Sequence, residues 1–195
     1  MSKKQRSAQC ANSTYLILTV LFIGLNIVPS FDVHASDTGN IDPATLKIED
    51  LIMCNHDVPT WYGFSIWFQD NNKATASLGM TPMKSTNIFL SQYRLSKPVT
   101  VFGRQTSRIA FGGDGPLAVL DSEPLEVLAA ELGVTPVRAT ANRYLGAKIV
   151  VKRPFDGGSP EFQGTELIQL NVSKISDMQG KLLVGCSYQL LFDEN

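Results

Sequence analysis

Residues 181–190, near the end of the chain, are Lys-Leu-Leu-Val-Gly-Cys-Ser-Tyr-Gln-Leu. Every second side chain of this run is apolar, and the apolar positions are Leu182, Val184, Cys186, Tyr188 and Leu190. Alternation with a period of two is typical of a β-strand with one buried face. The pattern predicts a core strand near the end of the chain, with Cys186 pointing into the interior.

A related pattern occurs in residues 45–54, Thr-Leu-Lys-Ile-Glu-Asp-Leu-Ile-Met-Cys. Its apolar positions on one face of an extended chain are Leu46, Ile48, Ile52 and Cys54, and Asp50 interrupts that face. We therefore expect a first strand over residues 46–54, with Cys54 directed toward the same core as Cys186. A Cys54–Cys186 disulfide follows from this arrangement. It closes a loop of roughly 130 residues, for which chain entropy gives at most about 5 kcal/mol of stabilisation.

The first 35 residues are organised like a secretion signal. Lys3, Lys4 and Arg6 precede an apolar run over residues 15–28, and Val33 and Ala35 supply small side chains before a cleavage point. The alternative is a retained membrane anchor, but the run is short for a bilayer core that needs about 20 apolar residues. We expect cleavage near Ala35. Residues 36–195 then remain as one exported domain, located in the periplasm or secreted.

The charge of this domain argues against nucleic acid as a partner. Removal of the leader reduces the 17 basic and 18 acidic residues of the full chain to 14 and 17, a net charge of −3. The charges are scattered and form no long run of either sign. A protein that binds nucleic acid or anionic lipid through its charge needs a basic surface, which this composition does not provide.

The order of the remaining patterns predicts an α+β fold. Strands are expected over residues 88–95, 99–102, 108–111, 117–120, 144–151, 166–175 and 181–191, and residues 73–86 and 154–164 are expected to be loops. A helix is predicted over residues 124–132, capped by Asp121 or Ser122 and ended by Gly133. The fold class is a mainly antiparallel β-sheet with one or two helices packed on one face and its first and last strands joined by the disulfide.

Residues 61–69, Trp-Tyr-Gly-Phe-Ser-Ile-Trp-Phe-Gln, fit either a strand or a helix. The preceding Pro59 and Thr60, and the Asp-Asn-Asn that follows, favour a helix capped by Asp57 or Thr60. The candidate binding residues are Trp61, Tyr62 and Trp67 of this segment, and Phe155 and Phe162 of the second loop. Aromatic side chains dominate protein interfaces, although packing in the core is the alternative role for each of them.

Motifs for catalysis, cofactors and metals are missing from residues 36–195. His56 is the single histidine there, which excludes zinc sites built from several histidines. A Cys54–His56 nucleophile pair would need the thiol that the disulfide consumes. The glycine cluster at 112–115 lacks the residues of a phosphate loop and the length of a dinucleotide loop, and residues 156–161 lack the alternating oxygen ligands of a calcium loop. We therefore predict no catalytic residue, no cofactor and no metal ligand.

These observations predict a non-enzymatic periplasmic or secreted binding protein that occludes a protein partner, as inhibitors and immunity proteins do. In size and layout the chain resembles many bacterial periplasmic inhibitor, immunity and accessory proteins. Two alternatives stay open. One is a hydrolase of envelope polymers, which would act through a pair of carboxylates. The other is a structural accessory subunit of an envelope machine.

Overall fold

The computed structural model describes residues 41–121, 123–140, 143–159, 162–175, 178 and 180–192. The expected signal sequence, residues 1–35, lies outside the described residues. One sheet of eight strands runs through the described part, in the order β1-β2-β3-β4-β8-β7-β6-β5, and all neighbouring strands are antiparallel. The prediction of a mainly antiparallel sheet accompanied by helices is thereby confirmed.

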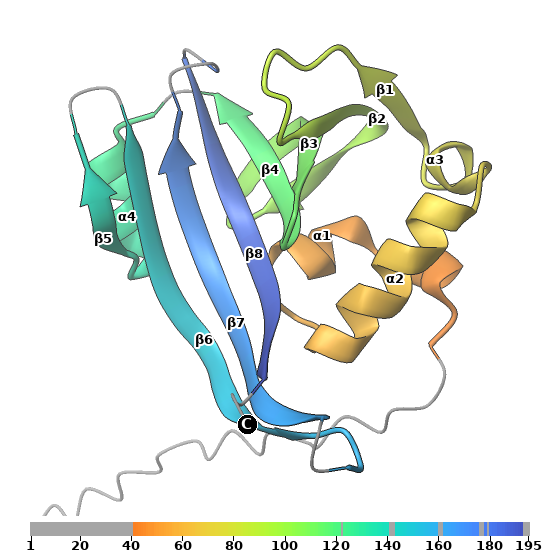
Figure 1. Ribbon diagram of the computed structural model, residues 1–195. Coiled ribbons are helices and arrows are strands. Elements are labelled where there is room, and N and C mark those ends of the chain that lie inside the picture. Colours follow the sequence, from red (N-terminus) through yellow and green to blue (C-terminus); the bar gives the residue numbers. More distant parts are fainter. Residues whose placement is uncertain are drawn as a thin grey trace, which may run out of the picture. The chain divides into compact units, whose positions relative to one another are not determined.

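The strands follow the helical amino-terminal part of the chain and occupy most of the remainder. Their bounds are β1 Met80–Met83, β2 Ser91–Val101, β3 Arg104–Gly112, β4 Gly115–Asp121, β5 Thr135–Ala139, β6 Tyr144–Asp156, β7 Gln163–Lys174 and β8 Lys181–Phe192. The helical elements are η1 Pro43–Thr45, α1 Ile48–Ile52, α2 Val58–Asp70, α3 Ala74–Ser77 and α4 Leu125–Leu132. In Figure 1 the sheet curves around α1 and α2, which lie against its concave face.

The main core lies between this concave face and the helices α1, α2 and α4. Alternation along the strands separates it from a smaller cluster on the opposite face of the sheet. In β8, for example, Leu182 and Val184 belong to the main core, whereas Leu183 packs in the smaller cluster with Val119 of β4. The period-two pattern of residues 181–190 is therefore the pattern of a strand with its main buried face toward the helices.

The segment expected as the first strand, residues 46–54, is helical instead. Helix α1 buries Ile48, Leu51 and Ile52, which have the i, i+3, i+4 spacing of one helical face. The strand interpretation placed Leu51 on the outer face, but its side chain is fully buried. A run this short fits both the helical period and the strand period, so packing against the sheet decides which structure forms.

Helix α2 confirms the helical interpretation of residues 61–69. The Asp57 carboxylate caps it by accepting a hydrogen bond from the Thr60 N–H at 2.9 Å, and Pro59 occupies the first turn. A second carboxylate, Glu166 of β7, accepts a hydrogen bond at 2.8 Å from the N–H of Val58, the first helical residue. This long-range contact, which also involves an ion pair between Glu166 and Arg153, fixes the start of α2 on the sheet.

Both segments expected to be loops are largely regular. Residues 73–86 contain α3 and β1, and β1 tolerates Pro82 because it is the edge strand of the sheet. Residues 154–164 continue β6 and β7 as far as the pair Asp156↔Gln163, which leaves only residues 157–162 for the connection between the two strands. Cross-strand pairing overrides the local turn preference of glycine and proline here.

The remaining corrections are smaller. The two strands expected over residues 88–102 form one bulged strand, β2, with the irregularity between Arg94 and Val99. Helix α4 begins after Pro124 and has no side-chain cap from Asp121, and Ser122 lies outside the described residues. Its end is as predicted, because Gly133 adopts the left-handed conformation at φ 67°.

The predicted Cys54–Cys186 disulfide is present, with a Cα–Cα distance of 5.3 Å. It joins the connection between α1 and α2, rather than a first strand, to the last strand β8. Tyr188, two residues further along β8, reinforces the junction by donating a hydrogen bond from its hydroxyl to the Leu51 carbonyl at 2.6 Å. Burial raises the pKa of this hydroxyl, and the negative charge of Asp57 adds to the effect, so the phenol stays protonated.

Candidate functional site

Helix α2 lies over a cluster of aromatic rings. Trp61 and Phe64 contact each other and Phe111 of β3, with ring centroids 5.9 to 6.3 Å apart. Phe68 is closer to Phe111, at 4.9 Å, and meets Tyr93 of β2 edge to face at 5.6 Å. These distances are those of favourable ring pairs, so the cluster ties the helix to β2 and β3.

The rings border a pocket of about 400 Å³ between α2, β2 and the hairpin that connects β3 to β4. We call it the aromatic pocket. Its walls are Trp61, Phe64, Ser65, Phe68, Gln69, Phe89, Ser91, Tyr93, Phe111, Gly112 and Gly113. The volume lies in the range of sites that receive small molecules or the side chains of partner proteins, about 300–1,000 Å³.

The chemistry of the aromatic pocket is that of binding. Its single titratable side chain is the Tyr93 phenol, and the other polar side chains are the neutral Ser65, Gln69 and Ser91. Gln69 donates a hydrogen bond to the Ser65 hydroxyl at 3.1 Å. Such a lining offers ring faces and neutral hydrogen-bonding groups, and it provides neither a carboxylate nor an imidazole for proton transfer.

Two of the segments that form the pocket also carry exposed apolar side chains. Ile88 and Phe89, in the connection before β2, are 91% and 80% exposed, and Asn87 orders this connection by accepting a hydrogen bond from the Phe89 N–H at 2.9 Å. Tyr62 and Ile66 are exposed on α2, the helix that forms one wall of the pocket. We call Tyr62, Ile66, Ile88 and Phe89 the apolar rim. Large apolar side chains beside a cavity are typical of an interaction surface.

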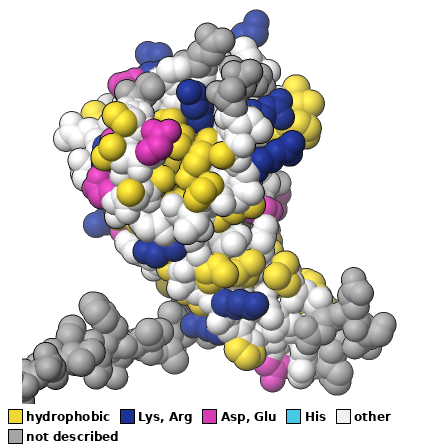
Figure 2. Space-filling model, turned by 90° about the vertical axis from the view of Figure 1, so that its left-hand side faces the viewer, with side chains coloured by type: hydrophobic (Ala, Val, Ile, Leu, Met, Phe, Trp, Pro, Cys, Tyr) yellow, Lys and Arg dark blue, Asp and Glu magenta, His cyan; other side chains and the backbone are white. Residues whose placement is uncertain are grey.

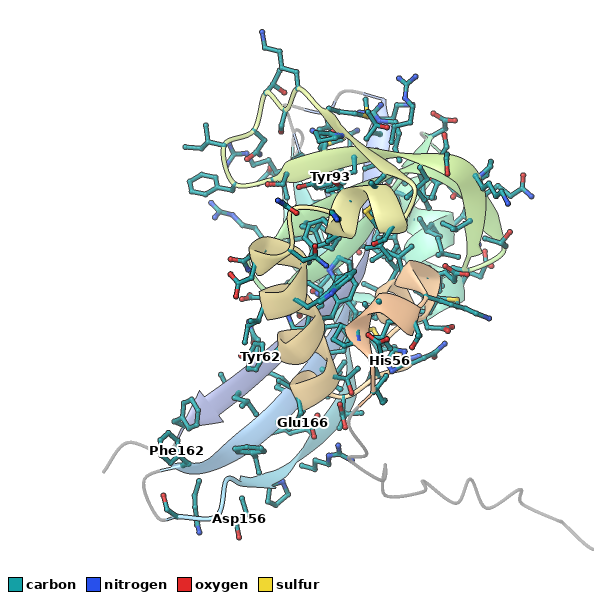
Figure 3. All side chains as sticks on the ribbon, turned by 90° about the vertical axis from the view of Figure 1, so that its right-hand side faces the viewer. His56, Tyr62, Tyr93, Asp156, Phe162 and Glu166 are labelled. Carbon is teal, nitrogen blue, oxygen red and sulfur yellow. A yellow bond between two sulfur atoms is a disulfide. The ribbon has the colours of Figure 1, made fainter. Side chains whose placement is uncertain are left out.

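The structure divides the five predicted binding residues between two places. Trp61 is buried, Trp67 is half-buried, and both have ring contacts with Phe64, whereas Tyr62 belongs to the apolar rim. Phe155 and Phe162 flank Gly157 at the far end of the β6–β7 hairpin. Figure 3 shows Phe162 at this end, far from Tyr93, and neither Phe155 nor Phe162 lines the aromatic pocket, so the two predicted groups do not form one site.

Sequence reasoning missed most of the pocket. Tyr93 and Phe111 belong to predicted strands, where an aromatic residue is ordinary, and Ile88 and Phe89 were assigned to the start of a strand. Ile88 and Phe89 differ from ordinary strand residues only in their exposure. They are exposed because β2 begins at Ser91, after both of them. No local signal in the sequence marks that point.

Several carboxylates are engaged in ion pairs. Arg104 binds Glu123 and Glu131 together, with nitrogen–oxygen distances of 3.1 and 2.7 Å, and Lys181 pairs with Asp121. Hydrogen bonds from Arg104 lower the pKa of Glu131, and Lys181 lowers that of Asp121. A glycosidase needs one carboxyl with a raised pKa as its general acid, and these two carboxyls have the opposite shift.

Two further chemistries find no support in the described part of the chain. His56 lies next to the disulfide, in the connection between α1 and α2, so Cys54 has no thiol for it to activate. Among the described residues, no three His, Cys, Asp or Glu side chains group as metal ligands would. The same residues include no helix long and apolar enough to cross a membrane.

A second set of exposed apolar residues lies on α4, β5 and β6, on the side of the molecule that Figure 2 presents. It comprises Val127, Val137, Leu145, Ile149 and Val150. Lysines 148 and 152 alternate with these residues along β6, and the pairing of β6 with β7 is irregular between Ile149 and Val151. None of these residues lines the aromatic pocket. This surface is therefore the weaker candidate.

Comparisons with protein-family models, with curated proteins and with solved structures find no match to this chain. The aromatic pocket and the apolar rim are therefore the features from which a function can be inferred.

Proposed function

We propose that this protein is a non-enzymatic binding protein that covers and thereby inhibits a protein partner, as an inhibitor or immunity protein does. The observation that carries the proposal is the apolar rim. Ile88 and Phe89 are consecutive large side chains that remain almost fully exposed beside a pocket lined by rings. Burial of such side chains against a partner is worth about 25 cal/mol per Å² of apolar surface removed from water.

The proposed compartment is the periplasm or the extracellular space, after cleavage near Ala35. The disulfide is compatible with an oxidising compartment. The absence of a carboxylate and a histidine from the aromatic pocket favours binding over hydrolysis at that site. The two alternative functions are a hydrolase of envelope polymers and a structural accessory subunit.

The test is affinity capture from an envelope extract, with the chain carrying a carboxy-terminal tag. Wild-type protein is compared with the double variant Ile88→Ser/Phe89→Ser and with Val137→Ser, which removes an apolar side chain that is 67% exposed on the remote strand β5. A protein captured by the wild type is then purified and its dissociation constant is measured. We expect the double variant to weaken binding by at least about fivefold, because truncated interface anchors typically cost more than 1 kcal/mol.

Unchanged melting temperatures are required, and Val137→Ser and His56→Ala should bind like the wild type. The intact mass of the tagged protein should correspond to a start within two residues of Ser36. Equal binding by the double variant and the wild type would contradict the proposal. Hydrolysis of envelope polymer that disappears on changing one carboxylate would favour the hydrolase instead.

A further inference from the structure

We propose that the aromatic pocket receives one aromatic side chain of the protein partner, an inference that rests on the proposed function. The apolar rim then contacts the partner surface around that side chain. The pocket is thus assigned a ligand class, an uncharged aromatic ring, and a source, a protein.

The geometry of the rings favours an aromatic occupant. Phe68, Tyr93 and Phe111 already form tilted and edge-to-face pairs at 4.9 to 5.6 Å, and all three line the pocket. A further ring that enters can form the same types of contact with them, because aromatic pairs are favourable at centroid separations of about 4.5 to 7 Å. The volume of about 400 Å³ leaves room for one side chain of this size.

The neutral lining disfavours an anionic occupant, because a buried carboxylate needs a partner of opposite charge and the pocket contains none among its lining residues. Ring faces attract cations, so the comparison of an aromatic probe with a lysine probe, described below, distinguishes these two occupants. Ser65, Gln69 and Ser91 supply neutral hydrogen-bonding groups instead. They suit the hydroxyl of tyrosine or the indole N–H of tryptophan, the polar tips of side chains that are otherwise apolar.

The rim favours a protein over a free small molecule as the source of the ring. Ile88, the most exposed large apolar side chain of the described residues, does not line the pocket. A small molecule inside the pocket would leave Ile88 in water, whereas a protein that inserts a side chain also covers the rim. The same contact would bury Phe89, which lines the pocket and is still largely exposed.

The pocket is also held in shape before binding. Its helical wall, α2, is fixed at its first turn by Asp57 and Glu166, and the Cys54–Cys186 disulfide anchors the chain just before it. Figure 3 shows Glu166 near one end of α2 and Tyr93 near the other. A preformed site loses little conformational entropy on binding, so more of the contact energy contributes to affinity.

Glycine positions provide a matched pair of variants for the test. A Cβ atom at Gly113, in the pocket wall, would have no atom within 4 Å, so Gly113→Trp adds a large side chain to this wall without a clash at its base. Gly63 is also open and lies on α2, but it does not line the pocket. Gly63→Trp is therefore the control, and Ser91→Trp is a second variant that blocks the pocket from another strand.

The first measurement uses N-acetylphenylalaninamide as probe and nuclear magnetic resonance spectroscopy of the wild-type protein. We expect the probe to shift the ring resonances of Tyr93 and Phe111, and N-acetyllysinamide to leave them unchanged. Gly113→Trp and Ser91→Trp should abolish the shifts, and Gly63→Trp should keep them. Absence of shifts in the wild type, or equal shifts with both probes, would overturn the inference.

The second measurement uses the partner that the apolar rim captures. Gly113→Trp should lower its affinity by at least about tenfold, as loss of a central interface anchor does, while Val137→Ser on the remote strand β5 stays within about twofold of the wild type. If Gly113→Trp and Ser91→Trp bind normally while Ile88→Ser/Phe89→Ser does not, the proposed function stands and this inference is wrong. If all of these variants bind normally, both are wrong.

Two other occupants are distinguished by the purified protein alone. A small molecule that remains bound in native mass spectrometry of the wild type, and is absent from Gly113→Trp, would show that the pocket takes a free ligand. A dimer in sedimentation that Gly113→Trp dissociates would show that a second copy of the chain occupies it. Either result would overturn the inference, and a monomer without bound ligand is expected.

Discussion

Glycine at position 115 allows the β3–β4 hairpin to lie directly against β8. A Cβ atom there would be 2.0 Å from the carbonyl oxygen of Cys186, and one at Gly185 would be 2.3 Å from that of Pro116. Both obstacles are backbone atoms, which cannot rotate away as a side chain can. Gly113, in the same hairpin, has open space around it, and neither Gly113 nor Gly115 has a positive φ. An added Cβ atom thus meets backbone at position 115, which is buried in β4, and open space at the exposed position 113.

We therefore predict opposite results for two alanine substitutions in one hairpin. Gly115→Ala should lower the free energy of unfolding by about 2–3 kcal/mol, because the strands must separate to admit the methyl group. Gly113→Ala should be neutral or raise it by up to about 1 kcal/mol, because the unfolded chain loses freedom. Urea denaturation at neutral pH measures both, and equal effects would show that the β4–β8 approach is not limiting.

Helix α4 is held by a charged side chain of the sheet rather than by its own cap. Arg104 of β3 donates hydrogen bonds to Glu123, just before the helix, and to Glu131 in its last turn. Lys148 of β6 donates to the carbonyl of Leu132 at 3.3 Å, the last residue of α4. Pro124 at the start provides no side-chain hydrogen bond. The position of the helix therefore depends on ionised carboxylates.

This arrangement predicts a pH dependence for the contribution of Glu131. Arg104 lowers the pKa of Glu131 in the folded protein, so the folded state binds its proton less readily than the unfolded state. The stabilisation is complete above the ordinary glutamate pKa of about 4.3 and is lost as the pH falls through the lower folded value. The melting temperature of the wild type should exceed that of Glu131→Gln at pH 7, and the difference should shrink below about pH 4.

Glu126→Gln is the matched control for this experiment. Glu126 is exposed on the same helix and has no ion pair among the described residues. Its substitution should change the melting temperature little at either pH. A difference between the wild type and Glu131→Gln that stays constant from pH 7 to pH 3 would show that the Arg104 pair contributes nothing to stability.

The described part of the molecule is closed by contacts between its first helices and its last strand. The disulfide links residues that are 132 positions apart, and Tyr188 of β8 contacts both Leu51 and Trp61. These contacts place α1 and α2 on the concave face of the sheet. The aromatic pocket depends on them, because one of its walls is α2.

Loss of the disulfide should therefore destabilise the whole fold. We predict that Cys54→Ser, Cys186→Ser and the double substitution lower the free energy of unfolding by similar amounts, up to about 5 kcal/mol, because one bond is lost in each case. Urea denaturation compares the three variants. Thiol titration of the unfolded wild type without reductant should find no reactive Cys54 or Cys186. Two reactive thiols, or a double variant much less stable than both single ones, would contradict the prediction.

The sequence by itself determined the features that depend on local patterns. Alternation in residues 181–190 predicted β8, the Asp57 cap and Pro59 favoured α2, and Gly133 marked the end of α4. Strands β3, β4, β6 and β7 were also placed, although their ends were not. These features are predictable because the residues that form an element's pattern and those that mark its ends all lie within about a dozen positions in the chain.

Tertiary structure alone decided the rest. Packing against the sheet made residues 48–52 a helix, pairing with β2 and β7 turned two expected loops into strands, and the start of β2 left Ile88 and Phe89 exposed. The aromatic pocket combines rings from α2, β2 and β3, whose positions are separated by up to 50 residues in the chain. The physical reason is that a cavity is the space left between elements after they pack. No single element contains the information that places it.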